Sequence, residues 1–335
     1  MRNSASSIRY LLVGVGASAA LTALVAAGAS QLSSFEIIGK TVPFAYPWRL
    51  TVPTLAAQLT AWTGYVVHSL LAWFIIYRAQ RERPKFGAQM RWFNWSMLAV
   101  HGSFTMLHMI QTRLFYDGLA RDVPEVTAQG SVALMLILIL ILETPRRGLA
   151  FGRKVAFSQR FVQILRKYHG YVFAWATIYT FWYHPTEGTW GHLLGFFYMF
   201  MLFVQSTLIF NRAHLNKWWT FTLEVFVLVH GVVVAVLQGY NLWPMFAFGF
   251  GAMIVLTQMY GLGLSKWVRG VLAAAFLIGV IATYAWMGRL SGLNEVVRIP
   301  VIEYLVVALL YGIYVGIDRV SRLVKQTRVE QAAAD

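Results

Sequence analysis

The sequence of 335 residues contains no cysteine. This absence excludes disulfides, iron–sulfur clusters, thiolate zinc sites and cysteine nucleophiles. A metal bound by this chain would therefore have histidine, carboxylate or methionine ligands. The sequence also lacks a Gly-x-Ser-x-Gly elbow, a phosphate-binding loop, a His-Glu-x-x-His motif and a dinucleotide fingerprint. No motif therefore supports a hydrolase, ATPase or dehydrogenase function.

Charge is also scarce, since only 12% of the residues are charged whereas 58% are hydrophobic. Soluble domains are roughly half apolar and about a quarter charged. The apolar residues form runs close to the roughly 20 residues that a helix needs to cross a bilayer. We therefore expect an all-α, polytopic integral membrane protein. Its single domain covers residues 1–317, and a cytoplasmic tail follows at 318–335.

The apolar runs predict about ten transmembrane helices. They end near residue 29, cover 51–77 and 92–115, end in the run 132–142, and then cover 168–183, 192–210, 218–237, 245–264, 271–287 and 301–317. All nine prolines are expected in loops or first helical turns, where they break no backbone hydrogen bond. They are residues 43, 47, 53, 84, 124, 145, 185, 244 and 300.

The net charge of +15 follows the predicted topology. Of the 28 Lys and Arg, six lie on one side of the predicted spans and the remaining 22 on the other. The six are Lys40, Arg49, Arg113, Arg121, Arg289 and Arg298. By the positive-inside rule, both termini are expected in the cytoplasm, and we expect the protein to lie in the plasma (inner) membrane. The basic inner connection 143–167 has an amphipathic pattern that predicts a helix on the anionic leaflet. The lipid bilayer explains the positive charge, and no nucleic-acid partner is expected.

Ionisable side chains inside a bilayer are costly, so each one in a span is a candidate for function. The competing role for a single histidine is a hydrogen bond to a neighbouring helix, and this role is the more common one. Helical rise places His68, His101 and Glu224 in one layer of the inner half, and His108 and His230 in one layer of the outer half. His101 and His108 share a helix face because they are two turns apart.

Residues 166–239 contain RKYHGYVFAWATIYTFWYH, an intervening helix, and HLNKWWTFTLEVFVLVHG. This stretch resembles the core of ferric-reductase-like and related b-type membrane cytochromes. The resemblance implies an inner haem b held by His169 and His214, and an outer one held by His184 and His230. It further implies a redox protein that exchanges electrons with quinone or with a partner protein.

Two other functions remain open. Histidines and a carboxylate meeting in one seam could bind non-haem iron, copper or zinc, in an enzyme acting on a lipid-soluble substrate. Its ligands would come from His68, His101 and His108, with Glu224 as an oxygen ligand or catalytic base. The loop HPTEGTWGH offers His184, Glu187 and His192 as a surface metal site, although a short turn between helices also explains these residues. A proton-coupled transporter would instead use Glu224 and Glu303.

Overall fold

The computed structural model describes residues 2–39 and 46–334. Two positions named above, Lys40 and Pro43, lie outside these residues. The described part contains ten α-helices: α1 (Arg2–Gly28), α2 (Leu55–Glu82), α3 (Trp92–Phe115), α4 (Glu125–Arg147), α5 (Gln159–Tyr183), α6 (Trp190–Thr207), α7 (Lys217–Gln238), α8 (Trp243–Leu256), α9 (Lys266–Trp286) and α10 (Glu295–Ala334). Five short 3₁₀ helices join them: η1 (Ala29–Ser34), η2 (Leu119–Arg121), η3 (Arg212–Leu215), η4 (Gln258–Gly261) and η5 (Leu290–Gly292). The predicted all-α fold is confirmed.

Seven helical segments of the described part are long and apolar enough to cross a membrane. They contain α1, α2, α4, α7, α8 with η4, α9 and α10. The chain is therefore a multi-span membrane protein. Four histidines lie in the other three helices: His101 and His108 in α3, His169 in α5 and His192 in α6. These three helices are less apolar partly because they carry these polar side chains.

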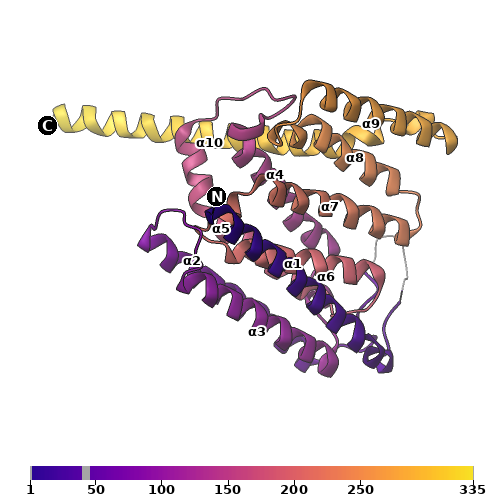
Figure 1. Ribbon diagram of the computed structural model, residues 1–335. Helices are drawn as coiled ribbons and strands as arrows, with labels where there is room; N and C mark the ends of the chain where they lie inside the picture. The colour runs from indigo at the N-terminus through magenta and orange to yellow at the C-terminus, as the bar shows by residue number, and fades with distance from the viewer. Residues whose placement is uncertain (1, 40–45, 335) are drawn as a thin grey trace.

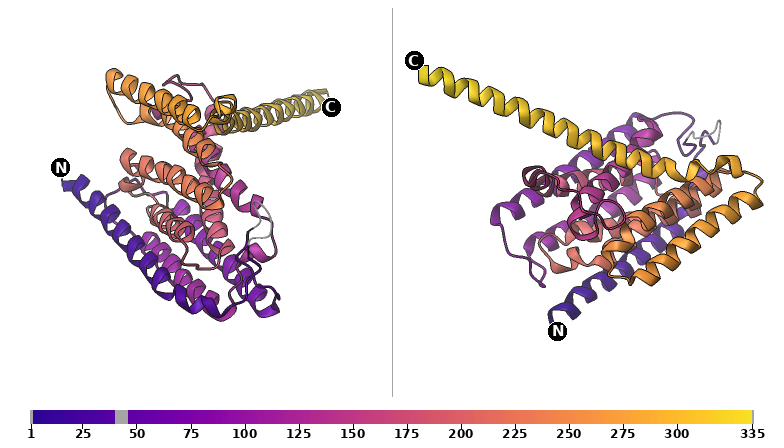
Figure 2. Two further views of the ribbon diagram at one scale, coloured as in Figure 1. Left: turned by 90° about the vertical axis from the view of Figure 1, so that its right-hand side faces the viewer. Right: turned by 90° about the horizontal axis from the view of Figure 1, so that it is seen from above.

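The helices form two neighbouring groups (Figures 1 and 2). In the first, α2 packs on α3 and α5, α4 packs on α5, and α6 packs on α1, α3 and α5. In the second, α8 packs on α7, α9 and α10. Contacts of α7 with α6 and of α10 with α4 join the two groups. The first group contains most of the buried aromatic residues, and all eight histidines belong to it or border it.

We call the end of the bundle where α2 and α4 finish and α5 and α7 begin the basic end. It carries Arg81, Arg146, Arg166 and Lys217, among others. Helix α1 begins and α10 ends on this side of the molecule (Figure 1). The loops around residues 46–54, 116–124 and 184–189 form the opposite end. Functional groups at the two ends are thus separated by the length of the helices.

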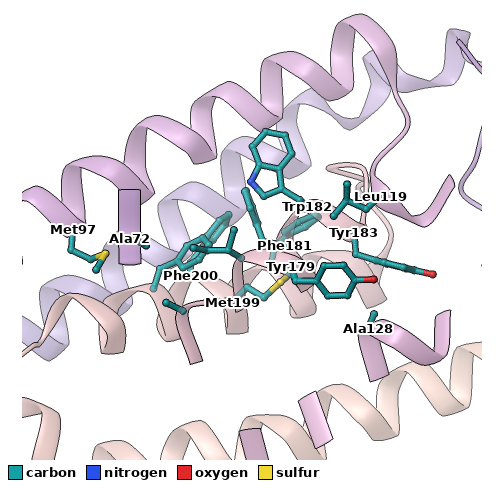
Figure 3. Packing of buried hydrophobic residues seen from close by; sticks show 14 of the residues in the cluster. Ala72, Met97, Leu119, Ala128, Tyr179, Phe181, Trp182, Tyr183, Met199 and Phe200 are labelled. Atoms are coloured by element: carbon teal, nitrogen blue, oxygen red, sulfur yellow. The ribbon is translucent and has the colours of Figure 1, made fainter. Parts of the chain in front are cut away.

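Trp182 is the largest fully buried side chain and lies at the centre of the first group (Figure 3). The helix α2 can approach it because residue 64 is glycine. A Cβ atom on Gly64 would lie only 2.1 Å from the Trp182 ring. The indole Nε1 of Trp182 in turn donates a hydrogen bond to His68. Packing at Gly64 and the position of a buried histidine are therefore coupled.

The prediction for the prolines is wrong at two positions. Pro145 lies inside the last turns of α4, and Pro300 lies inside α10. Each proline leaves a carbonyl one turn earlier without its helical donor. Such residues are tolerated in membrane helices where neighbouring groups satisfy the freed backbone. Because α4 continues through Pro145, Arg147 lies in its last turn, where the sequence analysis had expected a loop.

The connection after α4 is also shorter than predicted. Helix α4 extends to Arg147, and α5 begins at Gln159 and runs without interruption to Tyr183. The amphipathic segment expected to lie on the membrane surface is therefore partly the first turns of α5. At the other end of the chain, α10 continues through the predicted tail to Ala334.

Candidate functional site

Two histidines from separate parts of the chain lie next to each other at the basic end. His169 belongs to α5 and His214 to η3. Their ring centroids are 6.4 Å apart and their planes are inclined by 60°. Imidazole–metal bonds of roughly 2.0 Å place two nitrogens that share one ion about 4 Å apart, and hence the ring centroids about 6 Å apart. The spacing of the two rings is therefore compatible with one shared metal ion.

The protonation of these two rings is fixed by backbone carbonyls. Nδ1 of His169 lies 2.8 Å from the carbonyl oxygen of Arg166, and Nδ1 of His214 lies 3.3 Å from that of Gln205. A carbonyl can only accept, so each Nδ1 carries the hydrogen and donates it. Neither Nε2 has a hydrogen-bond partner among the described residues. This is how proteins orient metal-binding imidazoles, with one nitrogen anchored and the other free to coordinate.

A second pair lies between the helices of the first group. Nε2 of His68 is 2.8 Å from Nδ1 of His101, and Nε2 of His101 is 2.6 Å from Oγ of Ser206. Nδ1 of His68 accepts from the indole of Trp182 at 3.2 Å. Both histidines are almost completely buried. All four of their ring nitrogens already have partners, so a metal ion would have to displace one of them.

His108, on the face of α3 that it shares with His101, is held in the same way. Its Nε2 lies 2.8 Å from the carbonyl oxygen of His184, and its Nδ1 lies 3.0 Å from the amide of Gln111. The side chain is fully buried. This contact joins α3 to the end of α5. In this structure His108 makes the structural hydrogen bonds expected of a histidine between membrane helices.

A histidine cluster at the opposite end is organised by a tyrosine from the loop before α2. The hydroxyl of Tyr46 lies 2.9 Å from Nδ1 of His184 and 2.8 Å from Nε2 of His192. Nδ1 of His192 lies 2.8 Å from Oγ1 of Thr189. Burial raises the pKa of Tyr46 well above its usual value and lowers the pKa of His184 well below its own. The cluster is therefore a neutral hydrogen-bonded group.

The predicted outer pair, His184 with His230, has a different arrangement from the inner pair. The histidine ring that lies against His184 is that of His192, with centroids 5.5 Å apart. His230 of α7 lies instead against α6, where its Nε2 would be 2.9 Å from a Cβ on Gly195. A backbone hydrogen bond to Gly191 also engages the His230 ring. Small residues on α6 thus admit His230 as a helix-packing residue.

Glu187, predicted as a third member of a loop metal site, faces another partner. Its carboxylate accepts a hydrogen bond from the Tyr116 hydroxyl. Burial, followed by this bond and the carboxylate charge, raises the pKa of Tyr116. Nearby, Asp117 accepts from the backbone amide of Leu50 at 2.8 Å. These contacts hold the loops of the opposite end together. In the described residues, no group of three or more His, Asp or Glu side chains is placed to hold a metal ion.

The partner of Glu224 is an arginine that the sequence analysis did not single out. Its two carboxylate oxygens accept hydrogen bonds from Nη1 of Arg147, each at 2.8 Å. Both side chains are only 4% exposed. Sequence reasoning missed Arg147 because it directly follows Pro145 and Arg146, where the chain resembles the start of a cytoplasmic loop. It missed Tyr46, which lies outside every span, for a similar reason.

Comparisons with protein-family models, with curated proteins and with solved structures found no match to this chain.

Proposed function

We propose that this chain is a membrane redox protein that holds a b-type haem between His169 and His214. The observation that carries the proposal is the pair of imidazoles 6.4 Å apart, with both Nδ1 atoms anchored to carbonyls. Two Nε2 atoms without partners, on rings whose centroids are 6.4 Å apart, match the ligand set of a bis-histidine haem iron. The resemblance of residues 166–239 to b-type cytochrome cores predicts the same pairing, and it does so from the sequence alone.

The residues beside this pair also suit a haem. Arg166, Lys167 and Arg212 adjoin the two histidines in the chain and are exposed. Their positive charges would hold the two propionates of a haem by charge-assisted hydrogen bonds. The ring of Phe173 lies 6.0 Å from that of His169 and supplies an apolar contact. A bound haem would supply a one-electron carrier, and the protein would set its ligands and surroundings.

The proposal is limited to one haem. The rings of His184 and His230 already have other partners, Tyr46 for His184 and the backbone of Gly191 for His230. The haem would therefore lie near the basic end, where it would exchange electrons with quinone in the adjacent leaflet or with a partner protein.

We further propose that all ten helices cross the plasma (inner) membrane and that the basic end faces the cytoplasm. The excess of Lys and Arg at that end supports this orientation. The helices α3, α5 and α6 would cross with their polar side chains turned toward α2 and toward each other. Antiparallel packing of neighbouring helices along the chain supports the alternation of directions (Figure 1).

The test is the absorption spectrum of the detergent-purified protein, produced with an ample haem supply, in the oxidised and reduced states. The proposal predicts a Soret band and a b-type α band on reduction. The His169→Ala and His214→Ala variants should lose the bands, whereas the matched variants His184→Ala and His230→Ala should keep them. A wild-type protein that folds but shows no Soret band would overturn the proposal, and so would bands that survive both inner substitutions.

A further inference from the structure

Three charged side chains from three distant helices meet inside the second group of helices. Arg147 comes from the end of α4, Glu224 from α7 and Glu303 from α10. They line one cavity together with Thr257 and Gln258, which follow the end of α8. The structure thus brings together the two acidic residues that the sequence places within apolar spans.

The guanidinium of Arg147 pairs with only one of the two carboxylates, that of Glu224. Nη1 of Arg147 donates to both oxygens of Glu224, as described above. Glu303 is only 7% exposed and has no hydrogen-bond partner among the described residues. An isolated carboxylate in so apolar a place is strongly disfavoured as an anion.

Two residues that line this cavity carry buried polar atoms without a hydrogen-bond partner. Nε of Arg147 and Oε1 of Gln258 are buried without a hydrogen-bond partner. The cavity has a volume of about 20 Å³, which is enough for one water molecule. A water there could exchange a proton with Glu303 and form hydrogen bonds with the other two groups.

The cavity lies beside the carboxyl end of α8. Helix α8 stops at Leu256, and the chain continues through Thr257 into η4. The Leu256 carbonyl accepts from the amide of Phe151, so the loop after α4 folds against the end of α8. The carboxyl end of a helix carries partial negative charge and favours a positive ligand.

We propose that Glu303 is a proton-binding site, next to a permanent Arg147–Glu224 ion pair. The carboxylate oxygen of Glu303 forms an O–H bond with a proton taken from hydronium in the cavity, which leaves water. The positive charge of Arg147 then balances the negative charge of Glu224, and the protonated Glu303 is neutral. A metal cation is disfavoured because the guanidinium repels it and because the paired Glu224 leaves only one carboxylate for it.

The charged and titratable groups around Glu303 come from several elements. Glu303 itself faces Arg147 of α4, Glu224 of α7 and Tyr304 of α10, while Arg146 and Glu143 of α4 and Tyr198 of α6 face Glu224. Arg146 and Glu143 form their own ion pair nearer the surface. The charge balance at the cavity therefore depends on Arg147, Glu224 and Glu303.

The test is infrared difference spectroscopy of the purified full-length protein, recorded between neutral and alkaline pH. The wild type should show the C=O stretch of a protonated carboxyl at neutral pH. Glu303→Gln should lose this band and keep the wild-type melting temperature, because glutamine resembles the neutral acid. Glu295→Gln is the matched control on the same helix, where the carboxylate binds Arg289 and Tyr284, and it should keep the band.

A third variant separates this proposal from a simple buried acid. In Glu224→Gln, Arg147 becomes free to pair with Glu303, so the band should disappear although Glu303 is still present. Three results would overturn the proposal: a wild type without the band, a band that survives in Glu303→Gln, or a band removed by sodium at constant pH. The last result would identify a cation site. The readout does not depend on bound haem, so the two proposals can fail separately.

Discussion

Nε2 of His68 lies 2.8 Å from Nδ1 of His101, and the hydrogen between them belongs to His68. The direction is fixed because Trp182 can only donate to Nδ1 of His68, which must therefore accept. His101 then donates from Nε2 to Ser206, whose hydroxyl donates to the carbonyl of Phe203. The result is a one-way chain of hydrogen bonds that ties α2, α3, α5 and α6 together.

Breaking this chain at both histidines should cost less than the sum of the two single breaks. His101→Leu leaves the N–H of His68 buried without an acceptor, a loss of about 1–3 kcal/mol beyond the change in packing. The double variant His68→Leu/His101→Leu should lose less than the sum of the two single variants. The measurement is the free energy of unfolding in detergent micelles. Phe104→Leu is a control, because Phe104 stacks on His68 without a hydrogen bond. Strict additivity of the two histidine variants would contradict the chain.

The contact between α2 and Trp182 gives a second prediction. Gly64→Ala would place a methyl group 2.1 Å from the indole ring, and such overpacking typically costs about 1–3 kcal/mol. Displacing Trp182 would also weaken its bond to His68. Gly102→Ala is the matched control, since no atom lies within 4 Å of its added Cβ and alanine favours a helix by roughly 0.5–1 kcal/mol. Equal unfolding midpoints for the two variants would refute the close approach.

Much of the helical framework could be predicted from the sequence. The apolar run 92–115 coincides with α3 at both ends, because Pro84 and the basic residues after α2 mark the preceding boundary. The closeness of His169 and His214 also follows from the order of the helices. His169 lies near the start of α5, and His214 follows the end of α6; both of these helix ends lie at the basic end. The packing of α5 on α6 therefore brings the two rings together.

The partners of the buried polar groups could not be predicted. Successive residues on a helix point about 100° apart, so a boundary error of one residue turns a side chain toward another neighbour. His230 packs against Gly195, and the ring that lies against His184 is that of His192. Arg147 shows a second limit, because the continuation of α4 through Pro145 depends on tertiary packing. Only the folded structure shows that this arginine points inward to Glu224.

The depressed pKa of His214 predicts that acid weakens the basic end. Burial, followed by the charge of His169, lowers the pKa of His214 to about 4 from 6.5. Above pH 6.5 the histidine is neutral in both the folded and the unfolded states, so its contribution is constant. As the pH falls from 6.5 toward 4, only the unfolded state takes up the proton, and folding becomes less favourable by roughly 1–3 kcal/mol. Iron bound at Nε2 would act in the same direction, because a metal competes with the proton.

The measurement is the pH dependence of the unfolding free energy of wild type and of His214→Asn between pH 7.5 and 4.5. The wild type should become less stable relative to the variant over this range. His192→Asn, at the opposite end, keeps His214 and should retain this part of the pH dependence. A wild type and His214→Asn variant with parallel profiles would show that His214 is protonated equally in the folded and unfolded states.

Substitutions in the buried Arg147–Glu224 pair should cost much more stability than substitutions in the partly exposed Arg146–Glu143 pair. Arg147→Leu leaves Glu224 buried without its cation, and the loss of one partner from a buried pair typically costs about 3–5 kcal/mol. Arg146→Leu, one residue away, removes a side chain that is 34% exposed and bound to Glu143, so it should cost about 1 kcal/mol or less. The double variant Arg147→Leu/Glu224→Leu should regain most of the lost stability, because apolar residues of similar size replace both charges. The measurement that tests whether this ion pair is buried is the free energy of unfolding of these three variants. If Arg147→Leu and Arg146→Leu were equally mild, Arg147 would have to reach solvent, and the buried ion pair could not exist in the membrane-embedded protein.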